Sequence, residues 1–286
     1  MIQDYIQLIK PRIIPLLLLV AICSAFVAAR TVPPLVTLIG LLVSGTLVSG
    51  GALAVNSYLE VDADSKMRRT AHRPLPSGRI FPRYKAFIFG LSLIVVGLTF
   101  AFFSLNISAV LFIALGAFFY IQVYTIWLKP RTIWNIVLGG FAGSCASLAG
   151  WYAVTSNWPL VAWALAALVF VWTPSHFWSL AVLTEEDYSR AGVPMLPSVV
   201  GVVKASKAIV VNTLLLIPVS LLIYPYFRGA GSVLYLAVAT GLGLLLLFTN
   251  IKLLKSPTKE NAWLAFKFSS PYLAIIFVLA VIGALL

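Results

Sequence analysis

Nine runs of apolar residues, each long enough to cross a bilayer, follow one another along the chain. A transmembrane helix needs about 20 mostly apolar residues, because the hydrocarbon core of a membrane is about 30 Å thick. Only 10% of the 286 residues are charged, against about 25% in soluble domains. The sequence therefore predicts an all-α, polytopic membrane protein with nine transmembrane helices, at about 13–29, 35–57, 86–103, 108–127, 133–153, 159–182, 208–225, 232–250 and 269–286.

The lysine and arginine residues predict how these helices are oriented. If the N-terminus is inside, all twenty of them except Arg30 and Arg228 fall in inside segments. This agrees with the excess of lysine and arginine that cytoplasmic loops of membrane proteins carry. The same bias explains the net charge of +12, so the charge gives no reason to expect a nucleic-acid partner. No Arg- and Ser-rich leader precedes the first run. We expect a prokaryotic cell (inner) membrane, with the N-terminus and two long cap loops, about 58–85 and 183–207, in the cytoplasm.

The order of runs and loops indicates an internal repeat. Residues 1–127 and 128–250 each contain four apolar runs, and in each half an acidic loop follows the second run. Self-similarity of this kind is the signature of duplicated structural units. We predict one domain, 1–286, made of two pseudo-repeated four-helix units and a final helix at about 269–286.

Acidic residues are rare in this chain, and they are clustered. Six of the eight lie in two short polar stretches, Glu60–Asp64 and Glu185–Asp187, each at the end of an apolar run. In a soluble protein such a run would usually be a solvated helix end, with the acids paired to nearby arginines. At the end of a transmembrane helix, ionisable groups are expensive, and they favour a functional interpretation.

The spacing of the first stretch predicts a site for a divalent cation. On a helix that turns about 100° per residue, Asn56, Glu60 and Asp64 share a face, whereas Asp62 points away from them. Mg²⁺ prefers hard oxygen ligands and is usually held by one or two carboxylates together with substrate phosphates. Arg69 and Arg73 follow at once, and guanidinium groups match phosphate oxygens. We therefore expect Mg²⁺ and a polyphosphate here.

The second stretch contributes further candidates and leaves two questions open. Either Glu186 or Asp187 could supply a second metal ligand. His176 lies inside the sixth apolar run, where a lone histidine is most often a hydrogen-bonded packing residue. If the helix continues past Pro174, Asp187 falls on the same face as His176, eleven residues further on.

Together these motifs resemble the UbiA superfamily of intramembrane prenyltransferases. The first stretch reads Asn56-xxx-Glu60-xxx-Asp64-xx-Met67-x-Arg69-Thr70-xx-Arg73-Pro74-Leu75-Pro76-x-Gly78. Glu60 stands where many members have Asp. The second resembles the protohaem IX farnesyltransferase branch of that superfamily, and it reads Trp172-Thr173-Pro174-x-His176-Phe177-Trp178-x-Leu180, then Asp187-Tyr188-xx-Ala191-Gly192-Val193-Pro194-Met195-Leu196-Pro197.

The resemblance implies a reaction and assigns roles to residues. A farnesyl group would pass from farnesyl diphosphate to the 2-vinyl group of haem B, which is a substrate, giving haem O and diphosphate. Mg²⁺ would be held by Asn56, Glu60, Asp64 and Glu186 or Asp187. The expected partners of the substrates are Arg69, Arg73, Lys129, Arg131, Tyr188 and Trp178, with His176 available to the haem iron, a propionate or a proton. Aromatic rings, including Tyr58 and Phe177, could stabilise an allylic cation.

Two alternatives remain open at this point. Another member of the superfamily would use the same Mg²⁺–diphosphate chemistry on a quinone precursor, a chlorophyllide or a glycerol phosphate lipid. A secondary transporter would also have internal repeats, but its ion sites lie near the midplane of the bilayer. If the acceptor is haem, the resemblance implies a downstream haem-modifying enzyme or a terminal oxidase assembly as a further partner.

Overall fold

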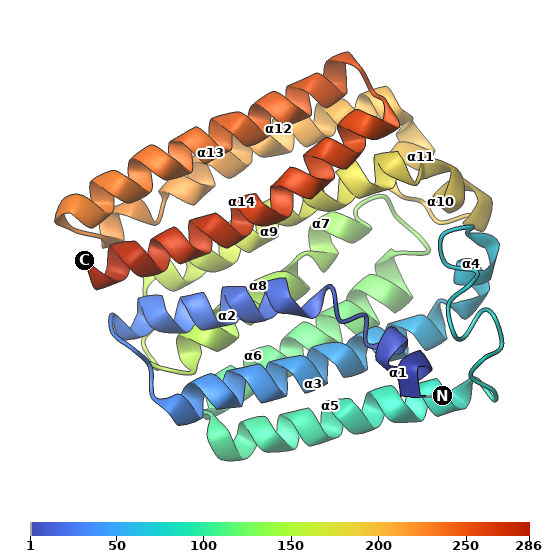
Figure 1. Ribbon diagram of the computed structural model, residues 1–286, viewed down its shortest axis with the longest axis horizontal. Coiled ribbons are helices and arrows are strands. Elements are labelled where there is room, and N and C mark those ends of the chain that lie inside the picture. Colours follow the sequence, from blue (N-terminus) through green and yellow to red (C-terminus); the bar gives the residue numbers. More distant parts are fainter. Residues whose placement is uncertain (1) are drawn as a thin grey trace.

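The computed structural model describes residues 2–286, and every regular element within this range is helical (Figure 1). The first half contains α1 (Ile2–Leu8), α2 (Ile14–Ala29), α3 (Leu35–Leu59), α4 (Val61–Lys66), α5 (Tyr84–Ser104), α6 (Ile107–Phe118) and the π-helix η1 (Phe119–Leu128). The second half contains α7 (Asn135–Gly139), α8 (Phe141–Tyr152), α9 (Leu160–Leu183), α10 (Glu185–Ala191), α11 (Leu196–Val200), α12 (Val202–Leu221), the 3₁₀ helix η2 (Tyr224–Tyr226), α13 (Gly229–Lys255) and α14 (Lys259–Leu285).

Long apolar helices make this a multi-pass membrane protein. Seven helical segments of the described chain are long and apolar enough to cross a bilayer, and α2 is a shorter apolar helix of 16 residues. The fifth predicted run, 133–153, is divided into α7 and α8 at Gly140. A Cβ at Gly140 would lie 3.1 Å from the side chain of Thr173, so α7 meets α9 closely at the break.

The last predicted helix was placed too late in the sequence. We expected it to begin at about 269, because Lys259, Glu260 and Lys267 interrupt the apolar pattern. The helix instead begins at Lys259 and continues through Pro271. Thr258 caps it, since its side-chain oxygen accepts a hydrogen bond from the N–H of Asn261, which satisfies one of the free donors at a helix start.

Small residues let the long helices approach one another. Gly51 of α3 faces Gly90 of α5, and a Cβ on Gly51 would lie 2.5 Å from the carbonyl oxygen of Gly90. α2 meets α8 in the same way, because a Cβ on Gly150 would lie 1.9 Å from the carbonyl oxygen of Ala21. Within a membrane, helices associate through close packing of this kind, since lipid is as apolar as a leucine side chain.

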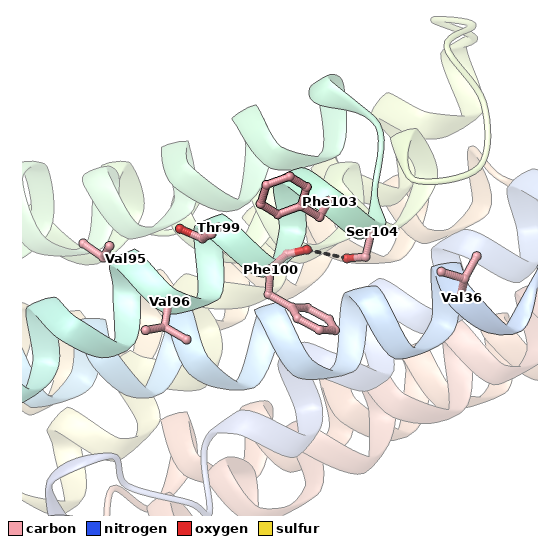
Figure 2. Close-up of a pocket in the computed structure, with 7 residues that line it drawn as sticks. All are labelled: Val36, Val95, Val96, Thr99, Phe100, Phe103 and Ser104. Atoms are coloured by element: carbon pink, nitrogen blue, oxygen red, sulfur yellow. Dashed lines mark hydrogen bonds between the residues drawn. The ribbon is translucent and has the colours of Figure 1, made fainter.

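The outer surface of the bundle is apolar and carries an open groove. Phe103 is 83% exposed and Leu160 84%, as expected for side chains that face lipid. The groove, of about 550 Å³, runs between α3 and α5 (Figure 2). It is lined by apolar and hydroxyl side chains, namely Val36, Val95, Val96, Thr99, Phe100, Phe103 and Ser104. This lining has no titratable group, so the chemistry must be sought elsewhere.

The polar residues gather at one end of the bundle. α4 follows α3, α10 follows α9, and both short helices lie at the same end as α1 and α11 (Figure 1). α4 packs against α10. The two acidic stretches, which are more than 120 residues apart in the sequence, therefore lie side by side.

Replacing Gly150 should weaken the contact between α2 and α8. The Gly150→Ala variant must displace the backbone of Ala21, and overpacking of this kind costs about 1–3 kcal/mol. Thermal unfolding of the purified protein in detergent should show a lower melting temperature. The control is Gly241→Ala in α13, where a Cβ meets no atom within 4 Å. Its melting temperature should stay the same or rise, because alanine favours a helix; equal effects of the two substitutions would contradict this account.

Candidate active site

The site starts at the end of α3, where Asn56 is buried and both ends of its amide are bonded. Its Oδ1 accepts a hydrogen bond from Lys10 Nζ at 2.9 Å, and its Nδ2 donates to Thr125 Oγ1 at 3.0 Å. Lys10 has φ +46°, a left-handed conformation that costs a non-glycine residue about 1–3 kcal/mol. Burial, together with the nearby charge of Arg73, lowers the pKa of Lys10 to about 8.

Glu60 forms an ion pair with Lys129 at 2.6 Å, and their side chains are only 13% and 15% exposed. Burial alone would raise the pKa of Glu60, but the charges of Lys129 and Lys10 hold it below its usual value. Burial alone would lower the pKa of Lys129, and Glu60 reverses this and raises it well above the usual value. Both groups are therefore charged at neutral pH.

The π-helix η1 brings Thr125 and Lys129 to this position. Its wider turn pairs the N–H of Lys129 with the carbonyl of Tyr124, five residues earlier, and Thr125 Oγ1 donates to the carbonyl of Tyr120. Tyr120 and Tyr124 stack with their ring centroids 5.7 Å apart, and Lys129 Nζ lies 5.5 Å from the centre of Tyr124. π-Helical turns are rare and frequently occur at functional sites.

Asp64 is the second buried carboxylate of the cluster. It is 5% exposed and accepts a hydrogen bond from Arg73 at 3.0 Å. Its backbone carbonyl accepts from the hydroxyl of Thr70 at 2.7 Å, which ties the loop after α4 to the helix. Asp62 points away, as predicted: its side chain is 84% exposed and pairs with Arg83.

Asp187 connects the two acidic stretches. Its carboxylate accepts hydrogen bonds from the backbone N–H groups of Arg68 at 3.0 Å and Arg69 at 3.3 Å, and it also faces Arg190 at 3.6 Å. Glu186 lies outside this cluster, because its side chain is 63% exposed and pairs with Lys259 of α14. Of the two acids that the sequence left open, Asp187 is the one beside the first stretch.

Some predicted site residues lie elsewhere. The guanidinium of Arg131 donates to the carbonyls of Ile126 and Trp127 at the end of η1. Arg69 is exposed. His176 does not share a face with Asp187, because α9 ends at Leu183 and a new helix begins at Glu185.

Two predicted aromatic residues do lie at the cap. Trp178 and Tyr188 are buried together with Met67, and the indole N–H of Trp178 has no hydrogen-bond partner within residues 2–286. Tyr58 packs instead against Phe87 of α5, with the ring centroids 5.4 Å apart. Among the aromatic candidates, Trp178 and Tyr188 are thus the ones that adjoin the loop after α4.

Sequence reasoning missed several members of the cluster, namely Lys10, Thr125, Tyr120 and Tyr124. Lys10 was visible as a charge just before an apolar run, but the Lys and Arg bias of cytoplasmic loops explained it equally well. The tyrosines and Thr125 lie within a run that satisfies the composition of a membrane helix. Only the π-helical hydrogen bonding, which no residue pattern predicts, brings Thr125 to Asn56, with Tyr120 and Tyr124 stacked on the same helix.

The donor atoms suit a divalent cation that also contacts a substrate. Asn56, Glu60 and Asp64 offer amide and carboxylate oxygens, and each now has a cationic partner: Lys10, Lys129 and Arg73 respectively. No group of three or more His, Cys, Asp or Glu side chains within residues 2–286 is arranged to hold a metal alone. Mg²⁺ typically completes its coordination with water and substrate phosphates, so two carboxylates and an amide fit it.

Comparison with known proteins identifies the family. The model of the UbiA prenyltransferase family matches residues 17–282. The chain belongs to this family. Relatives include protoheme IX farnesyltransferase 1 of Cenarchaeum symbiosum (strain A), 44% identical over 99% of this chain and 96% of the relative. The protoheme IX farnesyltransferase of Sulfurisphaera tokodaii is 43% identical over 99% and 93%.

Solved structures share the UbiA fold. A digeranylgeranylglyceryl phosphate synthase superposes with a TM-score of 0.74 at 21% identity, covering 99% of this chain and 98% of that one. A UbiA homolog from Archaeoglobus fulgidus bound to GPP and Mg²⁺ superposes with a TM-score of 0.72 at 15% identity, covering 97% and 99%. At these identities the likeness concerns the fold.

Substitutions of Glu60 and Lys129 should have strongly non-additive effects on the stability of the protein. Lys129→Met leaves a buried carboxylate unpaired, which costs about 3–5 kcal/mol. Adding Glu60→Gln removes that charge and should recover most of the loss. Thermal unfolding of wild type, both single variants and the double variant measures the coupling. Strictly additive effects would contradict a buried ion pair. The exposed Glu186–Lys259 pair serves as the control, and its coupling should be much smaller, because water and salt screen exposed charges.

Proposed function

We propose that this UbiA family enzyme is a protohaem IX farnesyltransferase, which converts haem B and farnesyl diphosphate into haem O and diphosphate. The observation that carries the proposal is the 38–44% identity, over nearly the whole chain, to relatives with that name. In the reaction the bond between farnesyl C1 and the diphosphate oxygen breaks, and C1 bonds to the terminal carbon of the 2-vinyl group. Water then adds its hydroxyl to the other vinyl carbon and releases a proton.

The cationic side chains of the cluster suit the diphosphate. Lys10 and Arg73 now donate hydrogen bonds to Asn56 and Asp64, and Lys129 forms an ion pair with Glu60. A bound diphosphate would take over these cationic groups. Charge-assisted hydrogen bonds of this kind are about twice as strong as neutral ones. Placed around the leaving oxygen, they stabilise the negative charge that develops as the C–O bond breaks.

The carboxylates suit Mg²⁺, which would neutralise part of the charge of the leaving diphosphate. We assign Asn56, Glu60 and Asp64 as its holders, with Asp187 rather than Glu186 as the acid from the second stretch. Asp187 lies at the loop that carries Arg73, whereas Glu186 faces outward. The known complex of a UbiA homolog with GPP and Mg²⁺ supports the use of a divalent cation.

Aromatic rings beside the cluster suit the allylic cation. Tyr120 and Tyr124 stack along η1, with Lys129 Nζ over the ring of Tyr124, and Tyr124 packs against the buried group that contains Tyr188 and Trp178. The negative face of an aromatic ring attracts a cation, by about 2 kcal/mol or more where water is excluded. The same packing keeps water from the cation before the vinyl carbon reacts.

The location follows from the charge bias. The end that carries α4 and α10 also carries most lysines and arginines of the chain, so we place it in the cytoplasm of a prokaryotic cell and the helices in its cell membrane. Haem O would then pass to a haem-modifying enzyme or to an oxidase under assembly in the same membrane.

Expression in cells that lack haem O synthase tests the acceptor. Extracted pigment should contain haem O, recognised by mass as haem B plus a farnesyl group and water. An inserted, folded protein that produces no haem O would overturn the assignment. Turnover with a quinone precursor, a chlorophyllide or a glycerol phosphate lipid would instead support the other acceptors.

Substitutions of Asp64 and Asp62 test the metal and diphosphate site, with Asp62 as the matched control. Asp64→Ala should lower the rate of diphosphate release about 10²-fold or more, because it removes charge stabilisation at the reacting end. Asp62→Ala should change the rate by no more than about twofold, since it breaks only an exposed pair. Removing divalent cations with EDTA should stop the wild-type enzyme, and added Mg²⁺ should restore it. Full activity of Asp64→Ala, or of the EDTA-treated enzyme, would contradict the site.

A further inference from the structure

His176 on α9 is held more firmly than a packing residue needs to be. Its imidazole stacks on Trp172, with the centroids 4.3 Å apart, and on Phe266 of α14, with the centroids 4.6 Å apart. The angles between the planes are only 20° and 28°, so both faces of the ring are covered. Only the edge of the ring, with its two nitrogens, remains free to interact.

One of those nitrogens is bonded to Ser269 of α14. His176 Nδ1 lies 2.5 Å from Ser269 Oγ, and the same hydroxyl donates to the carbonyl oxygen of Phe266 at 2.8 Å. A serine hydroxyl has a single proton to donate and lone pairs to accept with. Because its proton goes to Phe266, Ser269 accepts from His176. Nδ1 therefore carries the hydrogen, and Nε2 carries the lone pair.

Ser269 is itself held in place. Its backbone carbonyl accepts a hydrogen bond from the indole N–H of Trp172 at 2.8 Å, so the residue that stacks on His176 also anchors Ser269. The side chain of Ser269 is buried at 2% exposure. The position and the tautomer of His176 thus depend on one bonded set made of Trp172, Phe266 and Ser269.

Nε2, by contrast, makes no hydrogen bond to any residue between 2 and 286. Histidines that ligate metals almost always donate their other N–H to an oxygen, which sets the tautomer and makes the ligating nitrogen more basic. His176 has this arrangement with the ligand position open.

We propose that Ser269 is a positioning residue that presents His176 Nε2 to the iron of the haem substrate. This inference rests on the proposed function, because it assumes that the acceptor contains iron. The surroundings suit a flat aromatic macrocycle: Phe177 meets the edge of the His176 ring, and Trp263 packs near Phe266 and is 49% exposed. An iron–Nε2 bond would hold the tetrapyrrole in one position relative to the farnesyl donor.

The tautomer can be measured without substrate. The chain contains two histidines, so His72→Gln leaves His176 as the source of all imidazole signals. With ¹⁵N-labelled histidine, the nitrogen spectrum of the protein in detergent should show Nδ1 protonated and Nε2 unprotonated. Ser269→Ala should remove this preference. A wild-type spectrum with the proton on Nε2 would overturn the proposal.

Binding measurements with haem B and with metal-free protoporphyrin IX distinguish the contribution of the iron from that of the ring. Wild type should bind haem B about 10–100-fold more tightly than metal-free protoporphyrin IX. Ser269→Ala should bind the two tetrapyrroles about equally, because removing the hydrogen-bond partner of a ligating histidine typically costs about 10–100-fold in metal affinity. Affinity for metal-free protoporphyrin IX should not change. Ser269→Thr keeps the hydroxyl and should restore haem binding. Ser179→Ala is the matched control, because Ser179 is equally buried on α9 and bonds only its own helix.

The absorption spectrum of bound haem completes the test. Wild type should show the bands of imidazole-ligated iron, and Ser269→Ala and His176→Ala should lose them. Equal affinity for haem B and protoporphyrin IX, together with an unligated spectrum, would overturn the proposal even if haem O is still produced. A wild-type enzyme that makes no haem O would instead contradict the proposed function. His176 acting only as a base would slow turnover in His176→Ala and leave haem affinity and spectrum unchanged, which also overturns the proposal.

Discussion

The pairing of buried charges at one end of the bundle is the interaction on which the rest of the site depends. Glu60 and Lys129 are nearly enclosed, and an isolated charge in such surroundings would be neutralised or would unfold the region. Each charge is therefore stable only while its partner is present. Asp64 with Arg73 repeats the arrangement, and Lys10 donates a hydrogen bond to the neutral amide of Asn56. The cluster therefore holds cationic donors and hard oxygen ligands side by side, as the proposed binding of a diphosphate with Mg²⁺ requires.

The membrane helices serve to bring this cluster together. Lys10 comes from the chain before α2, Glu60 from the end of α3 and Lys129 from the end of η1. Close contacts at Gly51, Gly90 and Gly150 set the spacing of the helices, and the π-helical turn of η1 rotates Lys129 towards Glu60.

Much of this could be predicted, because some constraints act locally along the chain. Hydrocarbon thickness determines the length of an apolar run, and the helical repeat determines which acids share a face. Thus the separation of Asp64 from Asp62 was predicted and confirmed, and the overall all-helical membrane architecture was confirmed too. The predicted start of α14 was wrong by ten residues, because the helix begins at the cap formed by Thr258 despite the charges that interrupt the apolar pattern.

The sequence by itself determined that the chain is a helical membrane protein, that its acids lie at helix ends and that its motifs are those of the UbiA family. Only the tertiary structure decided which acid of the second stretch meets the first, that Lys10, Thr125 and the tyrosines of η1 belong to the cluster, and that Ser269 holds His176. The physical reason is that these contacts join residues up to 119 positions apart in the sequence, as Arg68 and Asp187 are. Hydrogen-bond geometry across helices depends on how closely and at what rotation they pack, and no local pattern of residues encodes that.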